Sequence, residues 1–296
     1  MATQSGAQTV SAVQWGLGLL SLRRLGRRYL LVAGGTIVVV VVLLTLLAGM
    51  LAPYSPTAAL GERLASPGPG HWMGTDQLRR DVFSRVLYGG RVPLMVAAIA
   101  TLVSFSVGSA LGWISGFWGG GLDRVLSLVM DAVYSFPALV LAIVVVAMLG
   151  PGMLNMILAI GIVYIPTYFR LARSQTLQVR QMEHVEASRA LGASRVRTLF
   201  LHVAPLTMPS LLAVTSFTVA DAILTEAALA FLGFGLPPPT PDWGFDIQNG
   251  QKFLQSGSWW LVAFPGAFII LVSLGFGMLG EGINDLLDPR RRKWTP

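Results

Sequence analysis

The segment Met182–Pro209 reads MEHVEASRALGASRVRTLFLHVAPLTMP and separates two strongly apolar parts of the chain. It contains no apolar run long enough to cross a bilayer, which takes about 20 residues in a helix. Apolar and charged residues recur at near-helical spacing on both sides of Gly192. This pattern predicts an amphipathic helical hairpin: one helix, a turn at Gly192, and a second helix that Pro205 stops. Its arginines place the hairpin in the cytoplasm, because basic residues concentrate on that side of membrane proteins.

The composition around this hairpin is that of an integral membrane protein. Of the 296 residues, 54% are hydrophobic and only 12% are charged, which is about half the charged fraction of a typical soluble domain. The net charge of +7 does not indicate nucleic-acid binding, because the basic residues cluster beside apolar stretches, as membrane topology requires. The chain has no cysteine, and therefore neither a disulfide nor a thiol nucleophile.

Apolar stretches along the chain predict an all-α integral membrane fold with six transmembrane helices. The predicted spans are Leu30–Ala52, Val92–Trp118, Val125–Leu149, Met153–Phe169, Leu206–Leu232 and Trp259–Leu279. Most lysines and arginines then lie on the cytoplasmic side, which places both termini there. The predicted divisions are a cytoplasmic segment 1–29, a first helix 30–52, an external loop 53–91, a transmembrane core 92–283 including the loop 182–205, and a basic cytoplasmic tail 284–296.

Two local patterns refine this outline. In the external loop, Thr75 or Asp76 is the predicted cap of a short helix with an apolar face. In the second span, Gly108, Gly112 and Gly116 recur every four residues and form a ridge of small residues that lets another helix approach closely. The sequence leaves open whether that helix belongs to this chain or to a second subunit.

Within the hairpin, Glu186-Ala187-Ser188, followed by Gly192 and then Pro205, resembles the EAA loop of ABC-importer permeases. The wider wording VEASRALGASRVRTLFLHVAP resembles the oligopeptide/dipeptide/nickel branch of that family, with Ser188 and Ala204 standing where alanine and leucine are usual. In such permeases this loop is a coupling helix that docks into a groove on the ATP-hydrolysing subunit. On spacing alone, the alternative is a helix resting on lipid headgroups. The resemblance implies the following ATPase-coupling residues: Glu186, Ala187, Ser188, Leu191, Gly192, Ala193, Arg195 and Pro205.

The same resemblance extends over roughly residues 71–292. It includes HWMGTDQLRRDVFSRVLYG, in which Arg79 stands where the family usually has glycine, and also FLGFG, PPTPDWG and EGINDLLDPR. The likeness implies a type I ABC-importer arrangement in the cytoplasmic membrane of a prokaryote. It also implies a second homologous permease, two ATP-binding-cassette subunits and an external substrate-binding protein as partners.

Charged residues inside the predicted spans are the candidates for function, because they are costly at membrane depth unless they face protein or water. Asp221 and Glu226 lie in the fifth span and are offset by about 140° around a helix, so they do not form one tight carboxylate pair. One interpretation places them on the translocation path, where they attract the positive end of a peptide. The other is a carboxyl group that caps a helix or bonds to a neighbouring helix; Glu226 fits both, and Asp221 favours the pore. Asp131, in the third span, is expected to pair with a cytoplasmic arginine.

Several other kinds of site are excluded. The three histidines, His71, His184 and His202, fall in separate loops, and no metal-ligand spacing such as H-E-x-x-H occurs. No serine lies in G-x-S-x-G, and no G-x-x-x-x-G-K-[ST] loop is present. We therefore expect no cofactor on this chain, with ATP and Mg²⁺ bound by the partner ATPases.

The sequence favours a permease subunit of an ATP-driven, binding-protein-dependent importer, most simply for di- or oligopeptides, and not an enzyme. A nickel chelate or haem is the alternative substrate. Two rival functions remain: a solitary secondary carrier, and an intramembrane enzyme using Asp221 and Glu226 as an acid/base pair.

Overall fold

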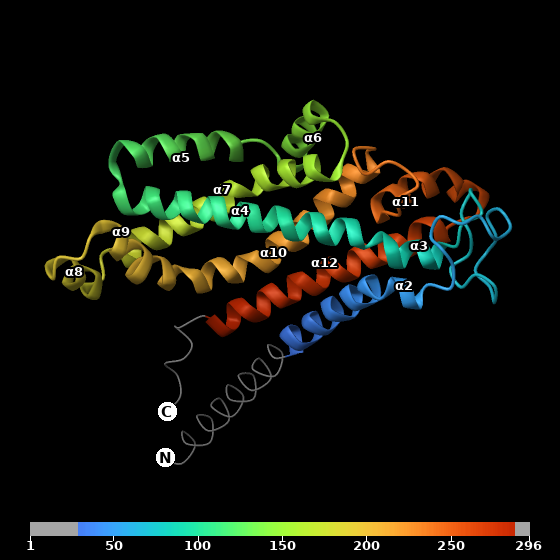
Figure 1. Cartoon of the computed structure of the whole chain (residues 1–296), viewed down its shortest axis with the longest axis horizontal. Helices are drawn as coiled ribbons and strands as arrows, with labels where there is room; N and C mark the ends of the chain where they lie inside the picture. The colour runs from blue at the N-terminus through green and yellow to red at the C-terminus, as the bar shows by residue number, and fades with distance from the viewer. Residues whose placement is uncertain (1–28, 288–296) are drawn as a thin grey trace, which may run out of the picture.

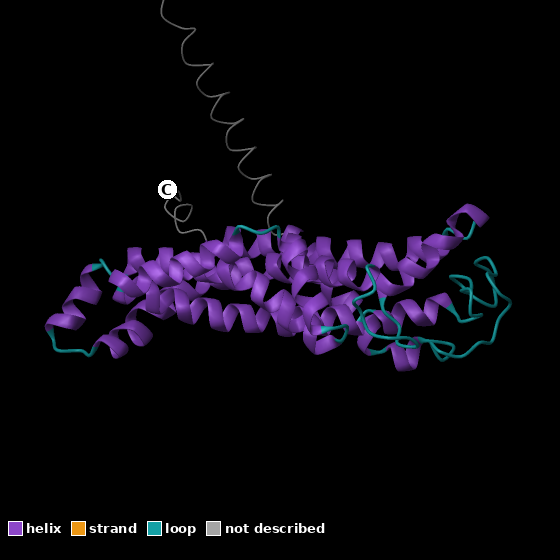
Figure 2. Cartoon of the chain, turned by 90° about the horizontal axis from the view of Figure 1, so that it is seen from above, coloured by secondary structure: helices purple, strands orange, loops and turns teal. Residues whose placement is uncertain are grey.

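The computed structural model describes residues 29–287, and within that range the chain is an elongated bundle of helices (Figures 1 and 2). The all-helical prediction is confirmed for these residues, since no strand longer than an isolated bridge occurs among them. Most of the predicted N-terminal segment 1–29 and of the basic tail 284–296 lies outside the described residues.

After a first helix, Tyr29–Leu46, the elements follow in this order: α2 (Ala48–Leu51), α3 (Val82–Gly89), α4 (Arg91–Trp118), α5 (Gly120–Tyr134), α6 (Ala138–Leu149), α7 (Met153–Val179), α8 (Glu183–Ala190), α9 (Arg195–Thr198), a π-helix (Leu199–Val203), α10 (Ala204–Phe231), α11 (Trp243–Gly250), a 3₁₀-helix (Gln251–Ser256) and α12 (Trp260–Leu287). Five of the described helical segments are long and apolar enough to cross a membrane, and a sixth is obtained if α5 and α6 are counted together.

A tight pair of helices, α4 and α7, forms the middle of the bundle. A Cβ atom placed on Gly112 would lie 2.5 Å from the carbonyl oxygen of Phe169, and one on Gly116 would lie 2.8 Å from that of Arg173. Gly108 meets the α7 backbone in the same way. The glycine ridge therefore packs inside this subunit, which resolves the question that the sequence left open.

The third predicted span is not one continuous helix. α5 and α6 are bent by 91° relative to each other at the break Ser135-Phe136-Pro137. Pro137 has no N–H for a helical hydrogen bond and disfavours helical backbone at the residue before it. The chain also reverses between α4 and α5 at Gly119 and Gly120, both with positive φ.

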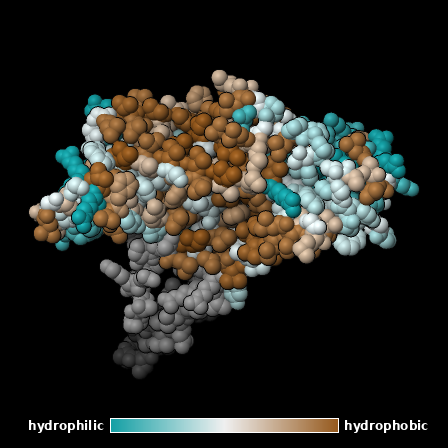
Figure 3. Space-filling view, viewed as in Figure 1, coloured by the Kyte–Doolittle hydropathy of each residue, from teal (hydrophilic) through white to brown (hydrophobic). Residues whose placement is uncertain are grey.

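The surface separates into a broad apolar band and two polar ends, as expected for a protein that crosses a bilayer (Figure 3). One polar end carries α8 and α9; the other carries α3, α11 and the loop before α3 (Figure 1). At the second end, the indole of Trp243 is fully buried and donates to the carbonyl oxygen of Val86 at 2.8 Å. The polar ends are thus held by packing to the same helices that cross the apolar band.

Aspartates cap the two helices of this end, α3 and α11. Asp81 caps α3 by accepting from the Ser84 N–H, so the predicted caps Thr75 and Asp76 are wrong. At the start of α11, Asp242 accepts from the Phe245 N–H in the same way. In both helices the cap is the aspartate that directly precedes the first turn.

Candidate functional site

The predicted coupling segment is a helical hairpin at one polar end of the molecule. α8 and α9 are joined by a turn in which Gly192 has a φ of +84°, a left-handed conformation that glycine adopts without strain. The side chain of Ser194 caps α9 by accepting from the Arg197 N–H at 3.3 Å. Helix, turn and second helix are therefore present as the sequence predicts.

Pro205 does not stop the second helix, contrary to the prediction. α9 continues through the π-helix into α10, and Pro205 lies in the first turn of α10. The Ala204 N–H donates to the carbonyl oxygen of Leu199, five residues back, and this wider turn accommodates a proline that has no N–H to donate. The hairpin is thus joined without a break to the helix that carries Asp221 and Glu226.

The hairpin is anchored on one side and open on the other. Val185 is fully buried and belongs to a cluster with Leu199 and Val203 at the base of α10. Arg189 lies over the ring of Phe117 at 4.9 Å, which ties α8 to the end of α4. In contrast, Leu191 is 89% exposed at the tip. The tip of the hairpin is therefore not covered by the described residues of this chain, and it is open to contact with another molecule.

Most of the predicted coupling residues lie on that open side. Ser188 and Ala193 are half-buried. The exposed members of the set are Glu186, Ala187, Leu191, Gly192, Arg195 and Pro205.

Asp221 lies on the open surface of the apolar band. It is exposed, and so are Phe217 and Leu224, which share its face of α10. Asp221 precedes Phe231, at the end of α10, by ten residues, or about 15 Å at 1.5 Å per residue. A charged group at that depth is costly against lipid, so this face requires water or a second subunit.

Glu226 has a different environment. Its side chain is fully buried and faces Asp242, which is also fully buried. Asp221 and Glu226 thus occupy different faces of α10, and the prediction that they form no pair is confirmed. Asp242 was missed as the partner of Glu226, because nothing in the spacing of two residues in different elements indicates contact.

Two ion pairs connect α5 with α7. Arg173 donates to Asp123 at 2.7 Å, and Arg170 donates to Asp131 at 2.8 Å. The guanidinium of Arg170 also lies 3.8 Å from the centre of the Tyr134 ring. Asp131 was expected to pair with one of the arginines predicted to lie on the cytoplasmic side, and its contact with Arg170 confirms that pairing.

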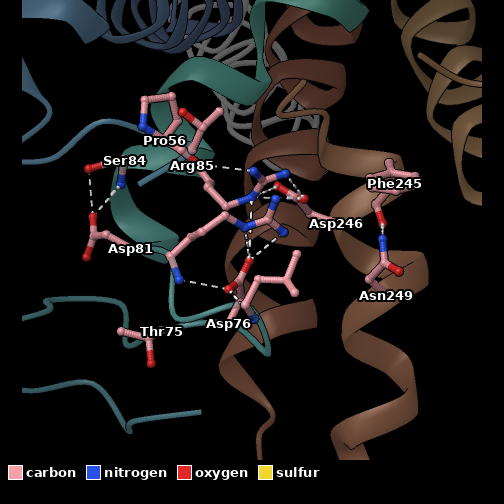
Figure 4. Close-up of polar contacts among 12 residues, drawn as sticks. Pro56, Thr75, Asp76, Asp81, Ser84, Arg85, Phe245, Asp246 and Asn249 are labelled. Atoms are coloured by element: carbon pink, nitrogen blue, oxygen red, sulfur yellow. Dashed lines mark hydrogen bonds and ion pairs between the residues drawn. The ribbon is translucent and has the colours of Figure 1, made fainter. Parts of the chain in front are cut away.

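A cluster of buried charges connects α3 and the loop before it to α11 (Figure 4). Arg80 donates to Asp76 at 2.6 Å, and the fully buried Arg85 donates from Nε to Asp246 at 3.1 Å. Arg85 also donates to the carbonyl oxygen of Pro56. Both arginines are thus matched by aspartates and packed inside the protein.

Arg79 adopts a φ of +64° in this loop. That backbone conformation is uncommon for a residue with a side chain and easy for glycine. It provides a physical reason for the glycine that the resemblance expects at this position.

Two family models match the chain. The model described as "Binding-protein-dependent transport system inner membrane component" matches residues 108–293, a range that includes the hairpin and Asp221. The chain belongs to this family. The model described as "N-terminal TM domain of oligopeptide transport permease C" matches residues 16–67 of this permease.

Curated relatives of the permease are similar over most of its length. It is 42% identical over 241 residues to the probable D,D-dipeptide transport system permease protein DdpC of Escherichia coli K12, covering 81% of this chain and 80% of that protein. It is 35% identical over 272 residues to the dipeptide transport system permease protein DppC of Bacillus subtilis 168, covering 92% and 85%. These relatives are named as transport permeases and not as enzymes, which confirms a multi-pass permease of a bacterial inner membrane.

The fold also matches solved structures. An inward-facing structure of the MetNI methionine ABC transporter superimposes with a TM-score of 0.54 at 17% sequence identity, covering 69% of this permease and 96% of that chain. At this identity the likeness shows the fold alone, and that fold is the one of an ABC-importer permease.

Proposed function

We propose that this permease is the transmembrane subunit of an ATP-driven importer of di- and oligopeptides, that it forms half of the translocation pore, and that it couples to ATPase subunits through α8 and α9. The observation that carries the proposal is the anchored hairpin with Leu191 exposed at its tip. Relatives named for dipeptides support the substrate class. A nickel chelate or haem is the alternative cargo.

The coupling mechanism follows from the continuity of the helices. The structure has one uninterrupted helical path from Arg195 to Phe231, which begins at the hairpin and passes Asp221. Closure of two ATPase subunits on ATP and Mg²⁺ would push α8 and α9, and the buried anchor at Val185 would transmit the movement to α4 and α7. The spans would then rock between inward- and outward-facing arrangements.

The proposed partners follow from the surfaces that one chain leaves open. A second homologous permease would cover the exposed face of Asp221 and complete the pore, because lipid is a costly neighbour for that carboxylate. Two ATPase subunits would occupy the hairpin end. A substrate-binding protein would dock at the opposite end, on the segments 53–91 and 233–258.

This assignment fixes the proposed topology. The hairpin, the N-terminal segment 1–29 and the tail 284–296 lie in the cytoplasm, and the loop 53–91 and α11 lie outside. A solitary secondary carrier would have no use for the open hairpin and would leave Asp221 against lipid, which is costly. An acid/base pair of Asp221 and Glu226 is disfavoured, because the two groups lie on different faces of α10.

Asp221→Asn should reduce ATP-driven uptake of a peptide with a free amino terminus by about tenfold, which corresponds to roughly 1.4 kcal/mol of lost interaction. The carboxylate would attract the ammonium group of the peptide, and the amide carries no charge. Uptake of labelled free and N-acetylated forms of one peptide into proteoliposomes containing the full transporter measures the difference.

Asp221→Glu is the matched control, because it keeps the charge and should keep the preference for the free amine. If Asp221→Asn reduced uptake of the free and the N-acetylated peptide equally, the role of Asp221 would be structural. Uptake that proceeds on a proton gradient without ATP would support the carrier instead.

A further inference from the structure

Two carboxyl groups face each other inside the protein, where α11 packs on the end of α10. Glu226 belongs to α10 and Asp242 immediately precedes α11, and neither has exposed surface. α11 lies directly on α10 here, since a Cβ on Gly244 would clash with the carbonyl oxygen of Ala227. The two acids are therefore sealed between two helices.

The oxygen atoms of this pair lack ordinary donors. Oδ1 of Asp242 accepts from the Phe245 N–H at 3.1 Å, as the cap of α11. Oδ2 of Asp242 and both carboxyl oxygens of Glu226 are buried and meet no N–H or O–H donor among the described residues. Buried acceptors without donors are rare and costly in folded proteins, so the two carboxyl groups are stable here only if they bond to each other.

Among residues 29–287, no neighbouring cation neutralises the pair. The charged group nearest on α11 is Asp246, which is itself acidic and is matched by Arg85 from α3. Arg80 pairs with Asp76 in the loop before α3. From α10, the remaining acid is Asp221, which points to the opposite, exposed face.

An ionised carboxylate only accepts hydrogen bonds, so two facing carboxyl groups are joined only if one of them carries a proton. Two buried charges of the same sign would repel each other and lose hydration at the same time. In agreement, burial raises the pKa of Asp242 to about 6.

We propose that Glu226 and Asp242 bind a single proton between them and that this proton holds α11 against α10. Water-exposed carboxyl groups release their protons near pH 4, so separation of the two helices would release the shared proton. The attached arrangement binds more protons than the separated one, and a rise in pH above about 4 therefore weakens the attachment, until the pair itself has ionised. The external end of the permease would open more readily at neutral than at acidic pH.

The chain lacks cysteine, so a single introduced thiol can report this opening without background. Ala230 is fully buried beneath Gly244, and A230C would react with a water-soluble maleimide only when α11 lifts. The full-length chain is purified in mild detergent with the partners it retains, and the labelling rate is divided by that of S256C, an exposed residue, at each pH. A227C is the second reporter if A230C disturbs packing. This readout needs no transport and is therefore independent of the proposed function.

We expect the normalised rate to rise about tenfold between pH 5 and pH 7. Glu226→Gln should keep the rate low and independent of pH, because its amide N–H donates to Asp242 permanently. Glu62→Gln, the same change at an exposed position outside the pair, should keep the slope of the unmodified chain. A flat profile with both reporters, or an unchanged slope in Glu226→Gln, would overturn the proposal. A labelling rate that changes when choline replaces sodium at constant pH would indicate that a metal cation, and not a proton, lies between Glu226 and Asp242. That result would also overturn the proposal.

Discussion

Gly112→Leu should prevent this permease from accumulating as a folded, monodisperse protein. A Cβ at this position would lie 2.5 Å from the carbonyl oxygen of Phe169 and 2.7 Å from the Cβ of Ala172. The first of these is a backbone atom of α7 and cannot rotate away, so α4 and α7 would have to separate along the middle of the bundle. Overpacking typically costs about 1–3 kcal/mol, and four added carbon atoms against a backbone exceed that range. Size-exclusion chromatography and thermal unfolding of the full chain in detergent measure the effect.

Gly121→Leu is the matched control. Gly121 lies in α5, and a Cβ there would meet nothing within 4 Å, so this variant should accumulate and melt like the unmodified chain. If Gly112→Leu also eluted as one peak with an unchanged melting temperature, the close α4–α7 contact would be wrong.

Asp246→Ala should destabilise the polar end that carries α3 and α11 by about 3–5 kcal/mol. Arg85 is fully buried and donates to Asp246. Without Asp246, Arg85 and Arg80 would share the single carboxylate of Asp76, which lies 3.9 Å from Arg85, so one buried positive charge is left uncompensated. The remaining bond from Arg85 to the carbonyl oxygen of Pro56 does not neutralise that charge. Limited proteolysis of the loop 53–81, together with the melting temperature, reports the loss.

The same change in an exposed ion pair provides the control. Asp131 and Arg170 have side chains that are 63% and 44% exposed, and Asp131→Ala should cost less than about 1 kcal/mol, as exposed ion pairs do. The double substitution Arg85→Met with Asp246→Leu should restore much of the stability, because it removes both buried charges. Equal melting temperatures for Asp246→Ala and Asp131→Ala would contradict the assignment of Arg85 and Asp246 as a buried pair.

Apolar patterning was sufficient to predict the helices, and local turn chemistry was sufficient to predict the hairpin. Gly192 is left-handed as the sequence implied, because a glycine between two amphipathic runs has few other roles. The glycine ridge of α4 was also readable, although its partner was not, since a period of four residues does not reveal which helix approaches.

Proline was the least predictable residue. Pro137 breaks a span by 91°, whereas Pro205 is accommodated by a π-turn and stops nothing. The difference depends on whether the preceding turn can widen, and that depends on packing around α10 that the local sequence does not describe.

Apart from the pairing of Asp131 with an arginine, contacts between distant segments could not be predicted. Arg85 and Asp246 are 161 positions apart, and Glu226 of α10 meets Asp242, the cap of α11. Such pairs depend on how α10, α11 and α3 come together, and only the assembled bundle reveals them.

The central claim is that α8 and α9 dock on an ATPase, and purification of the chain from its host in mild detergent tests it most directly. Mass spectrometry should identify a co-purifying P-loop ATPase, and Glu186→Lys combined with Gly192→Val should abolish its recovery. A Cβ at Gly192 meets nothing within 4 Å, so valine acts there only by straining a backbone with a φ of +84°. Gly192→Asn should retain the ATPase, because asparagine tolerates this conformation. The coupling assignment would be contradicted if no ATPase co-purified with the chain at any salt concentration. It would also be contradicted if the double variant retained the ATPase.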